Sequence, residues 1–180
     1  MIHIKACFLL FLLFAIPSQA RVFMIQKEAL KVAFTNASSV ERKTLFLTEK
    51  QAEEIQGLAK SKMDTQLATY YIGKNAQEIL GYAFFDTHIV RTMPESFMAV
   101  VNPDGTLRLV ELLAFHEPED YLPPKKWLGL FSKKKLDNEL WVKRGIRNIT
   151  GATLTTQAIT EGVRKILALF EVAVKKGNAK

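Results

Sequence analysis

The stretch of residues 96–115 constrains the fold of this chain most, because it predicts a tight antiparallel hairpin. Two extended segments, 96–101 and 106–115, flank the turn Asn102-Pro103-Asp104-Gly105. Proline presets the first central position of such a turn, and glycine accepts the positive φ that closes it. The second segment carries apolar residues on both of its faces. We therefore expect a sheet that is covered on both sides.

The remaining periodicity predicts helices before and after this sheet. Residues 26–34 have helical spacing, and Thr48 with Gln51 forms a capping box that opens a helix to about Lys60. Segments 68–72 and 79–90 are extended, the latter with a bend near residues 86–87, and 125–132 predicts a short helix. A last helix, about 154–175, carries one apolar stripe. The predicted fold is α+β, a curved antiparallel sheet with N-terminal helices and a C-terminal helix packed on one face.

The first twenty residues have the layout of a secretory signal peptide. Lys5 precedes an apolar run at residues 6–16, and Pro17 and a small-residue site ending at Ala20 follow. The run is shorter than the roughly 20 residues that span a bilayer, so cleavage near Ala20 is favoured over an uncleaved anchor. We expect residues 1–20 to be the leader, residues 21–180 to form a single domain, and the location to be extracytoplasmic, in the periplasm.

Charge and cysteine content narrow the function. The chain has a formal net charge of +7, and removing the leader, whose only charged side chain is Lys5, lowers it by one. A positive surface suits an anionic cofactor, anionic lipid or an acidic redox partner, but no nucleic-acid-binding signature accompanies it. The single cysteine, Cys7, lies in the leader, and His88 and His116 have no third ligand at useful spacing. We expect no metal site and no nucleic-acid partner, and we expect His88 to be solvated at a strand end.

Residues 150–155, Thr-Gly-Ala-Thr-Leu-Thr, run directly into the last helix. The unpaired N–H groups and the dipole at a helix start favour a phosphate. A plain alternative is a turn with a threonine N-cap.

The four residues Thr150 to Thr153 resemble the S/T-G-A-T signature of the FMN-binding domain family, found in flavin subunits of the sodium-pumping NADH:quinone reductase and the Rnf complex. The similarity in element order extends over about residues 70–173. The resemblance implies an FMN joined through its phosphate to Thr153 by a separate FAD:protein FMN transferase. The sequence agrees with attachment by a separate enzyme. A threonine hydroxyl needs an adjacent base to act as a nucleophile, and no His, Asp or Glu lies within five residues of Thr153.

The family's Glu-Thr-Pro-Gly loop, which lies close to the flavin, is matched here by residues 116–120, which keep Glu117. Aromatic faces for a flavin ring are available from Trp127, Phe131 and Trp141, although core packing is the alternative for each. One departure is Arg147, which stands where the family signature has an acid. The candidate cofactor-binding residues are Thr153, Thr150, Gly151, Ala152, Leu154, Thr155, Glu117, Trp127 and Trp141.

Three functions remain open from the sequence. The favoured one is an exported flavoprotein that carries FMN on Thr153 and transfers electrons at or near the membrane, with a membrane reductase or a quinone-linked protein as its partner. It is a carrier more than a stand-alone enzyme, and no catalytic residue is assigned. The alternatives are a non-covalent FMN-binding module or small reductase, and an exported interaction domain without flavin.

Overall fold

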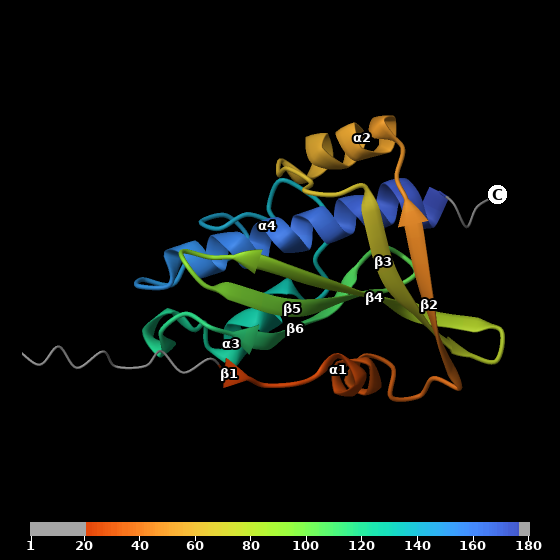
Figure 1. Ribbon diagram of the computed structural model, residues 1–180, viewed down its shortest axis with the longest axis horizontal. Helices are drawn as coiled ribbons and strands as arrows, with labels where there is room; N and C mark the ends of the chain where they lie inside the picture. The colour runs from red at the N-terminus through yellow and green to blue at the C-terminus, as the bar shows by residue number, and fades with distance from the viewer. Residues whose placement is uncertain (1–20, 177–180) are drawn as a thin grey trace, which may run out of the picture.

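The computed structural model describes residues 21–176, which form a six-stranded antiparallel sheet in the order β1-β6-β5-β4-β3-β2 (Figure 1). Its strands are β1 (Arg21–Val22), β2 (Ser39–Phe46), β3 (Leu67–Asn75), β4 (Glu78–Ile89), β5 (Pro94–Val101) and β6 (Leu107–Phe115). Strands β2 to β6 form a meander, and β1 pairs with β6 at the opposite edge. The predicted α+β architecture is confirmed.

Helices cover both faces of this sheet, as the apolar pattern of the hairpin predicts (Figure 1). The helices are α1 (Gln26–Ala33), α2 (Glu49–Ala59), α3 (Lys125–Leu128) and α4 (Thr153–Leu169), with short 3-10 turns at Glu119–Tyr121 and Gly129–Phe131 and a π-helical turn at Phe170–Lys175. Helix α4 crosses one face over a core that includes Phe84, Phe97 and Ile159, and α2 lies on α4. Helix α1 packs on the other face, where Ala29 and Ala33 join a smaller cluster.

Two local predictions hold in detail. The turn between β5 and β6 closes with a hydrogen bond from the Gly105 N–H to the Asn102 carbonyl at 2.9 Å, and Gly105 has φ +86°. The Oγ1 of Thr48 accepts from the Gln51 N–H at 3.2 Å, which completes the predicted capping box of α2. Helix α2 then ends at Lys60, which adopts the left-handed conformation with φ +58°.

Two local predictions are missing or wrong. Strand β2 is absent from the predicted elements because it is an edge strand whose side chains are mostly exposed, so it lacks an apolar face. The predicted bend near residues 86–87 does not exist, since β4 pairs with β5 without interruption through Asp86↔Phe97 and His88↔Glu95. The predicted leader, residues 1–20, lies outside the described residues.

Candidate functional site

Helix α4 and strand β4 run in opposite directions, which brings the start of α4 near the tip of the β4–β5 hairpin. Phe170, just beyond the end of α4, contacts Tyr82 near the start of β4, with ring centroids 5.1 Å apart. A methyl group at Gly162 would lie 2.8 Å from Asp86 Oδ2, so the two elements are in close contact at mid-length. Ala158 then lines a common hollow with residues 88 and 89 at the end of β4. The first turn of α4 and the hairpin tip thus share one end of the molecule (Figure 1).

The first turn of α4 has no side-chain cap. Its N-cap residue is Ala152, so the alternative of a threonine N-cap is wrong. The first backbone hydrogen bond of the helix runs from the Thr156 N–H to the Ala152 carbonyl at 3.0 Å. Within residues 21–176, the N–H groups of Thr153, Leu154 and Thr155 have no hydrogen-bond acceptor. The helix start therefore leaves three N–H groups without an acceptor in the described chain, two of them on residues that reach the surface, together with the positive end of its dipole.

Gly151 makes this open end accessible. It has φ +89°, a conformation that favours glycine, and a Cβ placed on it would meet no atom within 4 Å. Thr150 and Gly151 are exposed, Ala152 and Thr155 are buried, and Leu154 is 50% exposed. The candidate residues 150–155 therefore divide between the surface and the interior.

The Thr153 hydroxyl is half-buried and held by neutral groups. The side-chain amide of Asn148 donates to Thr153 Oγ1 at 3.2 Å, and Oγ1 donates a long bond of 3.5 Å to the Ile149 carbonyl. The other end of the Asn148 amide accepts from the Thr156 hydroxyl at 3.0 Å. Asn148 was not predicted as a site residue, although its place five residues before Thr153 was visible in the sequence. Within residues 21–176, the hydrogen-bond partners of the hydroxyl are thus an amide and a carbonyl.

Glu117 holds the hairpin tip. Its Oε1 accepts from the backbone N–H groups of Arg91, Thr92 and Met93 at 3.1, 2.7 and 2.9 Å, and the residue is buried. Burial raises the pKa of Glu117, but the three backbone donors outweigh it and the pKa lies below its usual value. Glu117 is thus a structural clamp on the tip that lies beside the start of α4.

The predicted aromatic residues take packing positions. Trp127 is buried, donates from Nε1 to the Arg147 carbonyl at 2.6 Å, and meets Phe131 edge-on at 5.2 Å. Trp141 is half-buried, and the Arg164 guanidinium lies 4.2 Å from its ring centroid. Trp127 therefore anchors the segment that leads into α4, and one face of Trp141 is already covered.

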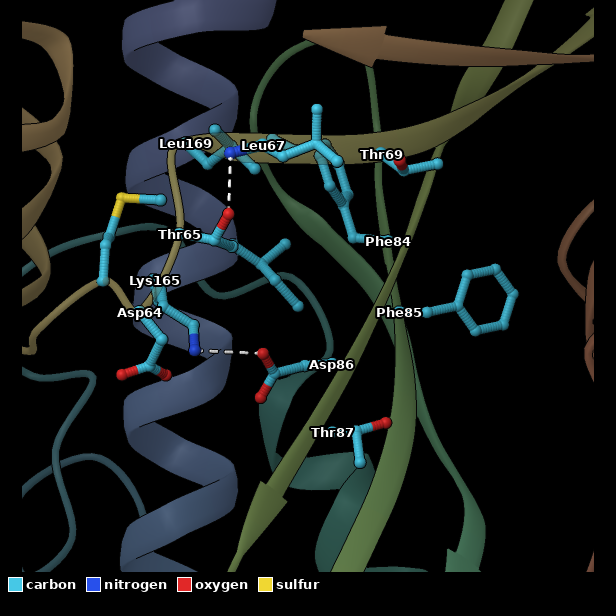
Figure 2. Close-up of a pocket in the computed structure, with 13 residues that line it drawn as sticks. Asp64, Thr65, Leu67, Thr69, Phe84, Phe85, Asp86, Thr87, Lys165 and Leu169 are labelled. Carbon is cyan, nitrogen blue, oxygen red and sulfur yellow. Dashed lines mark hydrogen bonds and ion pairs between the residues drawn. The ribbon is translucent and has the colours of Figure 1, made fainter. Parts of the chain in front are cut away.

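His88 is not a solvated residue, which corrects the prediction from the sequence. Its Nδ1 lies 2.9 Å from Asp86 Oδ2, and its Nε2 lies 2.7 Å from Glu95 Oε1. Lys165 of α4 completes the chain through a 3.0 Å ion pair with Asp86 (Figure 2). The spacing of Asp86 and His88 on one strand face, with Glu95 opposite in the hairpin register, is the signal that was missed.

The ionisation of this cluster follows from its burial and contacts. Burial lowers the pKa of His88, but the hydrogen bonds to Asp86 and Glu95 outweigh it and raise the pKa to about 9. Burial raises the pKa of Glu95 above its usual value, against the lowering effect of His88. Asp86 is also desolvated, yet His88 and Lys165 keep its pKa below the usual value. The imidazole is therefore charged at neutral pH.

Two hollows lie on either side of the Lys165–Asp86 pair. One, of about 290 Å³, has an apolar floor that includes Phe84 and Leu169 (Figure 2). The other, of about 370 Å³, is polar and includes His88 and Ala158. Among residues 21–176, no group of three His, Cys, Asp or Glu side chains is arranged to hold a metal ion. In the same range, no helix is both long and apolar enough to cross a membrane.

The geometry defines an α+β domain with an open helix start that carries a threonine hydroxyl, and comparison with known proteins agrees with the predicted resemblance. Residues 93–168 match the model of the FMN-binding domain, which covers the β5–β6 hairpin, Glu117 and the start of α4. The resemblance to this family is confirmed for that segment, and FMN is the cofactor that it indicates. Asp86 and His88 precede the matched segment.

A relative gives further context. Over 140 residues the chain is 28% identical to one of the subunits of the Na(+)-translocating ferredoxin:NAD(+) oxidoreductase complex of Acetobacterium woodii. The alignment covers 68% of this chain and 63% of that protein. The matched region therefore spans less than two thirds of the relative's length.

Proposed function

We propose that this protein carries one FMN, esterified through its phosphate to Thr153 Oγ1, and that it works as an electron-transfer subunit. The observation that carries the proposal is the placement of the Thr153 hydroxyl on the uncapped first turn of α4, inside the segment that matches the FMN-binding domain. When bound, FMN supplies one- and two-electron transfer, and the protein sets its position and surrounding charge.

The residues at the start of α4 fit a phosphate ester. The N–H groups of Thr153, Leu154 and Thr155 have no acceptor within the described chain, and phosphate oxygens are strong acceptors. The open space around Gly151 leaves room for these oxygens to approach the backbone. The helix dipole adds a favourable interaction with the negative charge.

The contacts of Thr153 support attachment by a separate enzyme. The hydroxyl touches the amide of Asn148 and the carbonyl of Ile149, neither of which takes up a proton at neutral pH. In the step that we assign to an FAD:protein FMN transferase, Thr153 Oγ1 attacks the FMN phosphorus of FAD. The phosphoester bond forms, the pyrophosphate bond breaks, AMP leaves and the hydroxyl proton goes to a base of the transferase.

Apolar surface for the flavin ring is available at the same end of the molecule. Leu154 is 50% exposed, and Ile89 and Met93 beside the hairpin tip are 61% and 41% exposed. Glu117 fixes the tip that bears Met93, so we assign it a positioning role toward the ring. Trp141, whose ring lies against Arg164 in the middle of α4, and Trp127, which is buried, act through packing.

The cellular setting is proposed from the leader and the relative. The relative's name describes a component of a ferredoxin:NAD(+) oxidoreductase complex, which favours a membrane redox complex or a quinone-linked protein as the electron partner here. Residues 1–20 are proposed to be a signal peptide, and residues 21–180 a single FMN-binding domain in the periplasm. The positive net charge suits an anionic cofactor and an acidic partner surface.

Co-expression with an FAD:protein FMN transferase tests the ester. The wild-type chain is expected to gain the mass of FMN less one water and to stay yellow after denaturation in guanidinium. Thr153→Ala is expected to be colourless, and Thr35→Ala, which removes an exposed hydroxyl outside the motif, is expected to load fully. Release of FMN from the denatured wild type would refute the ester and favour the non-covalent alternative, in which Arg147 blocks attachment. Absence of any flavin from all three proteins would favour the interaction domain.

A further inference from the structure

Four side chains of alternating charge form a partly buried row between the sheet and α4. It runs from Lys165 through Asp86 and His88 to Glu95, with successive contacts of 3.0, 2.9 and 2.7 Å. Asp86 and His88 lie on β4, and Glu95 lies opposite His88 on β5. Lys165 projects from α4 toward Asp86 (Figure 2). None of these side chains takes part in the proposed attachment of FMN.

Exposure differs between His88 and Glu95, and the carboxylate of Glu95 has one oxygen without a hydrogen-bond partner among the described residues. The His88 side chain is 19% exposed and lines the polar hollow, whereas the Glu95 side chain has no exposed surface. Within the described residues, Glu95 Oε2 is buried without a hydrogen-bond partner. A buried oxygen of this kind is stabilised when it binds a proton. Because His88 lines the hollow and contacts Glu95 Oε1, it links the carboxylate of Glu95 to solvent.

His88 and Glu95 lie close enough to the first turn of α4 for charges at the two places to interact. Ala158 and Glu161 line the same hollow as His88. At 1.5 Å per helical residue, these positions are about 8 to 12 Å along the axis from Thr153. Two charges at such a distance still interact when they are partly buried, because dissolved salt then screens them less. The other charged groups that face the pair are Lys62, Asp64, Glu161 and Glu117.

We propose that His88 and Glu95 form a proton-holding pair that takes up one proton when the start of α4 gains negative charge. The inference rests on the proposed function, because the charge is that of the reduced FMN on Thr153. Two electrons from a low-potential donor and one proton give the anionic reduced flavin. A second proton passes from solvent through His88 to the carboxylate of Glu95, which His88 contacts at Oε1. The pair then carries one net positive charge, which offsets the charge added at the flavin.

The physical cause is mutual linkage between the two charges. Negative charge nearby favours the protonated form of an acid, and protonation of that acid in turn favours the reduced flavin. The contacts to Asp86 and Glu95 raise the pKa of His88, and burial raises the pKa of Glu95, so both groups hold a proton more tightly than they would in water. Electron transfer and proton uptake are therefore coupled without contact between Glu95 and the cofactor.

The first test measures the midpoint potential of the FMN-loaded chain from about pH 5 to pH 9, with dithionite as the reductant. Each proton coupled to a two-electron reduction shifts the potential by about 30 mV per pH unit. The wild type is expected to have a slope steeper than that of His88→Gln/Glu95→Gln, in which neither position of the pair can take up a proton, by up to about 30 mV per pH unit. The matched control is Glu54→Gln, which removes a carboxylate from an exposed pair with Lys176 and should keep the wild-type slope.

Equal slopes in the wild type and His88→Gln/Glu95→Gln would overturn the pair while leaving the flavin assignment in place. A chain that takes up no FMN would overturn both proposals, because the charge that drives proton uptake would be missing. The two failures are thus distinguishable.

The second test is independent of the flavin. In the FMN-free Thr153→Ala chain, NMR should show an imidazole of His88 that stays charged to about pH 9. In Thr153→Ala/Glu95→Gln this titration should move toward the ordinary histidine value of about 6.5. The resonance is identified by comparison with His116→Gln. A His88 imidazole that titrates at the ordinary value in Thr153→Ala would overturn the pair.

Discussion

Arg164 fixes the position of α4, the helix that carries Thr153, and its replacement should have a large effect on stability. The guanidinium donates to the carbonyls of Leu58 and Ala59 at the end of α2, and to those of Asp137 and Leu140, at 2.7 to 3.3 Å. The bonds to Ala59 and Leu140 are buried, and the other two are partly buried. Arg164→Met leaves all four carbonyls without this donor.

The magnitude follows from the two buried carbonyls, since water can replace the donor at the other two. Each unsatisfied buried acceptor costs about 1 to 3 kcal/mol, so Arg164→Met should lower the free energy of unfolding by about 2 to 6 kcal/mol. A loss of about 3 kcal/mol corresponds to a fall in Tm of about 6 to 12 °C for a chain of this size. Urea denaturation at pH 7 measures the free energy, and a thermal melt measures Tm.

Lys176→Met is the matched control, because Lys176 also joins the C-terminal helix to α2. Its ion pair with Glu54 has a distance of 2.8 Å but is exposed. Exposed pairs contribute about 0 to 1 kcal/mol, so this variant should unfold almost as the wild type does. If Arg164→Met were as stable as Lys176→Met, the account of how α4 is anchored would be refuted.

Three further variants test the site. Glu117→Gln should destabilise the protein at pH 7 and less so toward pH 4. The pKa of Glu117 is lower in the folded protein than in the unfolded chain, so the carboxylate stabilises the fold above the unfolded pKa, and this stabilisation is lost as the pH falls through the folded pKa. Denaturation at both pH values measures the difference. Gly162→Ala should cost about 1 to 3 kcal/mol, since its methyl group would lie 2.8 Å from Asp86 Oδ2, and the cost should appear in urea denaturation. Trp127→Phe should lower stability by about 1 to 3 kcal/mol through loss of the bond to the Arg147 carbonyl, while FMN loading measured by absorbance stays stoichiometric.

Local chemistry explains which parts of the fold were predictable from the sequence. The capping box at Thr48 and the turn closed by Gly105 depend on residues a few positions apart, and both appear as expected. Strand β2 depends on pairing with β3, and its exposed side chains give no apolar alternation. A strand that gains its stability from a distant partner is not visible in its own sequence.

The candidate site also has parts that the local sequence predicts and parts that depend on distant residues. The motif that ends at Thr153 is contiguous, so its position at the start of a helix was predictable. Glu117 was noticed, but its clamp on the hairpin tip needs backbone N–H groups 24 to 26 residues away. The partners of His88 required the register of β4 and β5, because Glu95 faces it only when the hairpin is aligned. An assumed bend near residue 86 obscured that register.

A peptide map of the protein isolated from its own cells shows directly whether FMN is esterified to Thr153. Trypsin cleaves after Arg147 and Arg164, so the peptide of residues 148–164 contains Thr153 together with the other threonines of the motif and of the first turns of α4. We expect this peptide to carry one FMN, and we expect fragment ions to place it on Thr153. An unmodified peptide, in protein without flavin absorbance, would contradict that assignment.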